Sequence, residues 1–128
     1  MSTQVYLVRG LVETPAFRNG AIRCMTESAL KEMLDALARD PLAGDLIAAT
    51  GGVRKLRWGT GRDDGKRGGV RVLYYARQHT DRPIYLLTCM PKREDKHLTA
   101  AQKKALARAI SEIDRANVVR LDAIRRGR

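Results

Sequence analysis

The sequence predicts an α+β fold in which helices pack on one face of a small antiparallel sheet. Residues 26–39 carry apolar side chains at three- and four-residue spacing, as along one face of a helix. Three later segments are rich in β-branched and aromatic residues and are separated by Gly, Asp and Pro: 53–58, 69–77 and 83–90. Thr99 and Gln102 then form a capping box, which predicts the start of a C-terminal helix.

The first half opens with a predicted strand at residues 4–11, where aliphatic and β-branched residues dominate. Thr14 followed by Pro15 predicts the beginning of a short helix around residues 16–18, which Gly20 is expected to interrupt. The helix predicted at 26–39 should end at Asp40, because a residue that precedes proline is disfavoured in the helical conformation.

The second half is predicted to form three consecutive antiparallel strands and a helix. The third strand is almost entirely apolar and should be the most buried. In the final helix Leu106, Ile110 and Ile113 recur at helical spacing, and we expect Lys103, Lys104 and Arg108 on the opposite face. Residues 115–128 form a basic C-terminal extension. With the helices on one side, the other face of the sheet is expected to be free.

Size and charge restrict the class of protein. A chain of 128 residues fits one domain, spanning 1–128, because two domains would each bury too little apolar surface. The 25 Lys and Arg residues exceed the 14 Asp and Glu residues, giving a net charge of +11. The whole excess lies in residues 53–128, and so polarised a basic surface indicates a polyanionic partner such as nucleic acid. The alternative is a solvated basic face that only confers solubility.

Several common sites are excluded by spacing. The glycine-rich segment 59–69 lacks the interval, the Ser or Thr after lysine, and the following helix that a phosphate-binding loop requires. We interpret it as a loop that presents Arg62, Lys66 and Arg67. His79 and His97 stand apart from other ligand types, so neither a metal nor another cofactor is expected.

Cys24 and Cys89 are far apart among apolar neighbours and are interpreted as reduced packing thiols. No segment has the length and apolarity of a membrane-spanning helix, and the amino terminus lacks the pattern of a signal peptide. We therefore expect a cytoplasmic protein with no membrane partner.

Cationic side chains within the predicted strands carry the functional signal. Because side chains alternate along a strand, Lys55 and Arg57 share one face of segment 53–58, and Arg54 lies on the other. In the next strand Arg71 and Tyr75 share a face. Clustered cations on a sheet are unfavourable unless an anion is bound to them, and RNA phosphate is such an anion. The alternative is a set of salt bridges to the acidic helix at 26–39.

These residues resemble a known family of toxins. The resemblance covers roughly residues 40–110 in one unbroken order, and it rests on the segments AGDLI (43–47), TGGVRKLRW (50–58), GGVRVLYY (68–75), IYLLT (84–88), PKRE (91–94) and LT (98–99). The succession of these segments is similar to RelE-superfamily toxins of the HigB branch, which belong to type II toxin-antitoxin systems. The extension beyond about residue 113 is longer than is usual in that family.

The resemblance implies a RelE-like fold and a hydrolase that inhibits translation. Such toxins are metal-independent endoribonucleases (mRNA interferases) that cleave mRNA, usually on the ribosome. The RNA's own 2′-hydroxyl attacks the adjacent phosphate and leaves a 2′,3′-cyclic phosphate. The implied partners are a HigA-like helix-turn-helix antitoxin and, through that complex, operator DNA.

The resemblance also implies basic site residues: Lys55, Arg57, Arg71, Lys92 and Arg93. Of these, Lys55, Arg71, Lys92 and Arg93 are expected to be catalytic. His97 joins the catalytic set because it precedes the final helix and could approach the sheet face. The two arginines suit transition-state stabilisation, because a guanidinium stays protonated and donates in a fork. Amines among other cations lose protons more readily, so the two lysines are the candidates for the general base. The remaining basic and aromatic residues are expected to bind RNA: Arg54, Arg57, Arg62, Lys66, Arg67 and Tyr75.

One departure from the family pattern concerns the general acid. Many relatives carry a tyrosine near the end of the fourth strand, where this chain has Met90 and Pro91. His97, Tyr75 and Lys92 are the alternative acids. The alternative functions are a basic module that binds nucleic acid without cutting it, and a protein whose basic face serves only to bind an antitoxin.

Overall fold

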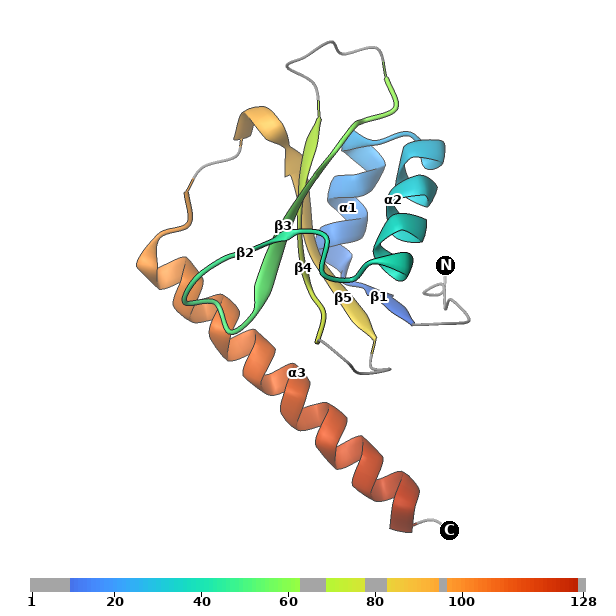
Figure 1. The fold of residues 1–128 in the computed structure, drawn as a ribbon. Coiled ribbons are helices and arrows are strands. Elements are labelled where there is room, and N and C mark those ends of the chain that lie inside the picture. The colour runs from blue at the N-terminus through green and yellow to red at the C-terminus, as the bar shows by residue number, and fades with distance from the viewer. Residues whose placement is uncertain (1–9, 63–68, 78–82, 95–96, 127–128) are drawn as a thin grey trace.

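The computed structural model describes residues 10–62, 69–77, 83–94 and 97–126, with side chains described up to residue 116. The elements follow the order β1 (Leu11–Glu13), α1 (Pro15–Cys24), α2 (Glu27–Arg39), β2 (Asp45–Leu46), β3 (Val53–Trp58), β4 (Val70–Tyr75), β5 (Ile84–Pro91), the 3₁₀ turn η2 (Lys92–Glu94) and α3 (Ala100–Arg126). The α+β class is thereby confirmed. In Figure 1, α1 and α2 lie on one side of the sheet and α3 on the other.

The sheet is mixed, and this corrects the prediction of a purely antiparallel one. Its strand order is β1-β5-β4-β3-β2, and β1 pairs with β5 in parallel while the other pairs are antiparallel. Neighbouring antiparallel strands could be inferred from the turns between them. The pairing of Leu11 with Ile84 joins distant parts of the chain, so no turn residue signals its direction. The predicted strand at 4–11 falls largely on residues outside the described part.

The two N-terminal helices begin at threonine caps. The Thr14 hydroxyl accepts a hydrogen bond from the Phe17 amide at 3.2 Å, and the Thr26 hydroxyl accepts one from the Ala29 amide at 3.1 Å. The expected interruption at Gly20 is wrong, because α1 continues to Cys24. Gly20 instead permits close packing, since a Cβ added there would lie 1.9 Å from the Cys89 carbonyl oxygen.

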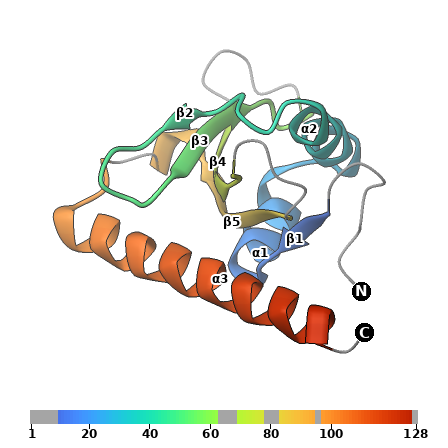
Figure 2. The same cartoon turned by 60° about the horizontal axis from the view of Figure 1, so that its bottom comes forward.

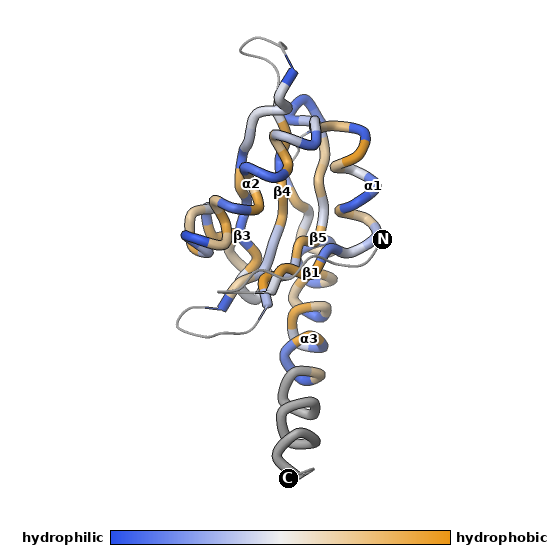
Figure 3. The backbone as a smooth tube through the Cα atoms, turned by 90° about the vertical axis from the view of Figure 1, so that its right-hand side faces the viewer, coloured by the Kyte–Doolittle hydropathy of each residue, from blue (hydrophilic) through white to orange (hydrophobic). Residues whose placement is uncertain are grey.

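The sheet is covered on both faces by different helices. On one face the α1 and α2 side chains pack with Val70, Val72 and Tyr74 in the larger core. On the other, Leu106 and Ile110 of α3 pack with Val53, Leu73 and Tyr75. Figure 2 shows α3 running along this second face and past the sheet. The expectation of a free second face is therefore wrong for the part under α3. The hydropathy in Figure 3 alternates along α1 and α2, as is typical of amphipathic helices.

A β-bulge lies in β5. Leu73 pairs with Thr88 and Tyr74 with Leu86, so Leu87 is the extra residue. Leu87 packs in the cluster beneath α3, whereas Cys89 packs in the core beneath α1. The bulge therefore turns Thr88 and Met90 toward the face on which α3 lies. That face carries the candidate site.

Candidate functional site

Strands β3 and β4 place three basic side chains on the α3 side of the sheet. Arg57 and Arg71 are paired across the two strands, and Lys55 pairs with Leu73, a member of the cluster under α3. Residues opposite one another in an antiparallel pair point to the same face. The predicted sharing of a face by Lys55 and Arg57 is confirmed, and Arg71 joins them.

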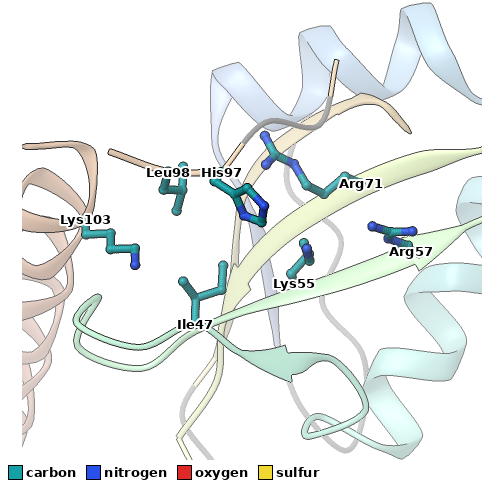
Figure 4. Close-up of a pocket in the computed structure, with 7 residues that line it drawn as sticks. All are labelled: Ile47, Lys55, Arg57, Arg71, His97, Leu98 and Lys103. Atoms are coloured by element: carbon teal, nitrogen blue, oxygen red, sulfur yellow. The ribbon is translucent and has the colours of Figure 1, made fainter. Parts of the chain in front are cut away.

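These side chains surround a hollow of about 240 Å³, which we call the cationic hollow. Its lining residues are Ile47, Lys55, Arg57, Arg71, His97, Leu98 and Lys103. Figure 4 shows His97 over the sheet, with Lys55 and Arg57 projecting from β3, Arg71 from β4 and Lys103 from α3. Four cationic groups and one imidazole therefore line the hollow, and its described lining includes no carboxylate. Such an arrangement favours an anion.

Arg71 is the most buried of these cations, with 5% of its surface exposed. Its Nη2 donates to the Sδ of Met90. Burying a guanidinium costs free energy unless nearby groups compensate its charge. A side chain held in this way keeps its donors fixed, which suits recognition of a developing negative charge.

The acidic helix α2 and the β2 residue Asp45 lie on opposite faces of the sheet. Helix α2 packs on the opposite face of the sheet, so it is not positioned to form the set of salt bridges considered as an alternative. Asp45 in β2, however, lies directly opposite Lys55 in β3. Its carboxylate is therefore on the same face of the sheet as that lysine. The residue directly opposite Arg57 in the β3–β4 pair is Arg71.

Local structure around α3 brings His97 and Lys103 to the hollow. The capping box is confirmed, since the Thr99 amide donates to the Gln102 Oε1 at 2.8 Å and the Gln102 amide donates to the Thr99 Oγ1 at 3.1 Å. This fixes where α3 begins, directly after His97 and Leu98. The β2–β3 turn brings Ile47 from the other side, because the Thr50 hydroxyl bridges the Ile47 carbonyl and the Val53 amide.

Several predicted site residues lie elsewhere. Arg54 projects away from the cationic hollow and donates to the Gly44 carbonyl at 2.8 Å. Tyr75 is buried under α3, where its hydroxyl donates to Asp114 at 2.9 Å. Arg62 and Arg93 line a separate hollow with Arg23.

Lys92 also lies outside the lining of the cationic hollow. Its amide donates to the Gly69 carbonyl at 2.9 Å, at the end of β5. Lys66 and Arg67 fall outside the described residues. The structure therefore gathers Lys55, Arg57, Arg71 and His97, and separates them from Arg54, Tyr75, Arg62, Arg93 and Lys92.

Lys103 is a site residue that the sequence reasoning missed. It was expected on the outer face of the helix, yet it is half-buried and lines the hollow. The signal was present, because Lys103 precedes Leu106 by three residues and Ile110 by seven. That spacing places it on the sheet-facing side of α3. Lys104 and Arg108 are exposed, as expected.

Comparison of the sequence with models of known protein families found no match. Within the described ranges, no three His, Cys, Asp or Glu side chains come together as a possible metal site. Of the helices that the structure describes, none combines the length and apolarity needed to cross a membrane.

Proposed function

We propose that this chain is a metal-independent endoribonuclease of the RelE/HigB type, the toxin of a type II toxin-antitoxin system. The observation that carries the proposal is the convergence of Lys55, Arg57, Arg71 and Lys103 with His97 around one hollow on the sheet. These residues come from three separate segments of the chain. A phosphodiester is the ligand that this combination of positive charge and one imidazole suits best.

The proposed reaction is an internal transfer at phosphorus. The 2′-hydroxyl loses its proton to a base and its oxygen bonds to the adjacent phosphorus. The bond from phosphorus to the 5′-oxygen then breaks, and that oxygen receives a proton from an acid. The products are a 2′,3′-cyclic phosphate and a 5′-hydroxyl, so no water or redox partner is consumed.

Position within the hollow supports one choice of acid and base. Lys55 lines the hollow and Lys92 does not, so Lys55 is the proposed base. His97 is the proposed acid, because it also lines the hollow, whereas the Tyr75 hydroxyl is bound to Asp114. Arg71 and Arg57 would stabilise the extra negative charge that forms on the phosphate oxygens. Lys103 would hold the neighbouring backbone phosphate as a point charge.

The biological setting follows from the sequence resemblance. The proposed substrate is mRNA bound to the ribosome, in the cytoplasm. The proposed partners are a small helix-turn-helix antitoxin and, through it, operator DNA. A gene for such a protein beside the gene for this chain would support the proposal independently of any measurement on the site.

Growth provides the test in cells. Induction of the chain alone is expected to arrest growth, and Arg71→Ala is expected to relieve the arrest while the protein still accumulates. Arg39→Ala, which changes an exposed arginine at the end of α2, is the matched control and should remain toxic. Normal growth with soluble wild-type protein would contradict the proposal.

A second candidate function is binding of nucleic acid without cleavage. It is favoured by Met90, whose sulfur contacts Arg71 near the position at which relatives carry a tyrosine. This function predicts RNA binding that weakens with salt, at a slope of about 0.7 per phosphate neutralised on a single strand. It also predicts no new RNA ends, so detection of cyclic phosphates would exclude it.

A further inference from the structure

An apolar slot of about 350 Å³ lies beside the cationic hollow, between the sheet and the first turns of α3. Leu73, Thr88, Met90, Gln102, Ala105 and Leu106 line it. Most of these side chains are aliphatic, in contrast to the neighbouring hollow. The slot is therefore suited to an apolar group rather than to another phosphate.

Arg71 and Leu98 belong to both spaces, so the slot and the hollow are contiguous. Both residues are drawn in Figure 4. In a nucleotide a single sugar joins the phosphate to the base. A phosphate held by Arg71 therefore brings an attached base to the edge of the slot.

Thr88 gives the slot a hydrogen-bonding group. Its Oγ1 is buried and has no hydrogen-bond partner among the residues that the structure describes. The bulge at Leu87 turns this residue toward α3. A buried hydroxyl that lacks a partner is unfavourable, and a bound ligand with polar edges removes that cost. A nucleobase has such edges.

We infer that the slot binds the nucleobase next to the phosphodiester held in the cationic hollow. The aliphatic walls contact the faces of the base, and the Met90 thioether adds a favourable contact with an aromatic ring. The Thr88 hydroxyl, whose Oγ1 has almost no accessible surface in this structure, bonds to the polar edge once a lining side chain moves aside, and it contributes base preference. This inference rests on the proposed function, since it needs RNA phosphate in the hollow.

The Thr88→Val variant tests the role of the hydroxyl. Valine keeps the shape of threonine and removes a buried group that has no protein partner in the described residues, so thermal stability is expected to hold or rise. The base preference at the cleavage site, measured on a random-sequence RNA pool, is expected to relax by about three- to tenfold. An unchanged preference would show that Thr88 does not read the base.

A matched pair of alanines tests the slot itself. Ala105 and Ala101 are both exposed on α3, but only Ala105 lines the slot. The probe is a 2′-O-methyl tetranucleotide, which cannot be cut. It is made in two forms, with and without the base next to the phosphodiester that the cationic hollow would hold. Ala105→Leu is expected to weaken binding of the complete probe by about tenfold and to leave the abasic probe unchanged, because stacking of a base is lost. Ala101→Leu is expected to change neither.

These measurements separate the two proposals. If the wild type binds complete and abasic probes equally, the inference is overturned. The remaining candidate ligand of the slot would then be an apolar side chain of a partner protein. If binding depends on the base and on Ala105 but RNA is never cut, the inference stands and the nuclease proposal fails. If RNA is cut but the complete and abasic probes bind equally well, the inference about the slot is refuted and the nuclease proposal stands.

Discussion

Arg57 and Arg71 lie directly opposite each other across β3 and β4. Like charges in opposite positions of an antiparallel pair destabilise a sheet. Arg71 is also buried, which adds to the cost of keeping it charged. A polyanion bound to both guanidinium groups would offset the repulsion between them.

A polyanion that cannot be cut is expected to stabilise the fold. Added at about 100 times its Kd, a 2′-O-methyl oligonucleotide should raise the free energy of unfolding by about 2.7 kcal/mol. Thermal unfolding with and without the oligonucleotide measures this increment. At the same oligonucleotide concentration, Arg71→Gln should lose most of it and Arg39→Gln should keep it. Equal increments in the two variants would argue against Arg71 as an anion ligand.

Tyr75→Phe should affect stability rather than cleavage. The Tyr75 hydroxyl donates to both carboxylate oxygens of Asp114, at 2.9 and 3.0 Å, and so fastens α3 to β4. Loss of a hydrogen bond to a charged group costs about 1.5–3 kcal/mol. Denaturant unfolding measures that cost, and the rate of RNA cleavage should change by less than about twofold. A large loss of rate at unchanged stability would place the phenol in the chemistry.

Gly20→Ala is expected to destabilise the protein although alanine favours helices. Helix propensity alone predicts a gain of about 1 kcal/mol. The new Cβ would meet the Cys89 carbonyl oxygen at 1.9 Å, and forcing such a contact costs about 1–3 kcal/mol or more. Gly59→Ala is the control, because no atom lies within 4 Å of a Cβ added there. A stabilised Gly20→Ala variant would contradict the packing of α1 on β5.

Burial raises the pKa of the Cys89 thiol to about 12, with a smaller contribution from Cys24. Because the folded chain holds the neutral thiol, this group stabilises the fold fully below its ordinary pKa of 9.0. The contribution is lost as the pH rises toward about 12. The difference in unfolding free energy between wild type and Cys89→Ala should stay constant from pH 7 to 8 and shrink above pH 9. A constant difference up to pH 11 would be inconsistent with a buried thiol.

Much of the fold could be predicted because its signals are local. The capping box at Thr99 and the bounds of β3 follow from neighbouring residues, and both are confirmed. The parallel pairing of β1 depends on contacts between distant segments, which no local pattern records. The continuous α1 was missed because Gly20 was interpreted from its helix propensity, whereas its role lies in packing against Cys89.

The candidate site was predictable where it depends on strand alternation. The shared face of Lys55 and Arg57 follows from the period of a strand. The bulge at Leu87 changes that period within β5, and it decides that Thr88 faces α3. The position of α3 over the sheet likewise decides that Tyr75 is covered and that Lys103 lines the hollow. These arrangements are tertiary, so sequence spacing alone did not reveal them.

The chemistry of the RNA ends tests the central claim most directly. Purified chain is incubated with single-stranded RNA, alone and with programmed ribosomes, in the presence of a chelator, and the new 3′ ends are identified by mass. The account predicts 2′,3′-cyclic phosphates whose rate of formation falls at least about 100-fold in Arg71→Gln. The rate should remain near wild type in Arg54→Gln, whose side chain lies away from the cationic hollow. Intact RNA under both conditions, or equal rates in the two variants, would contradict it.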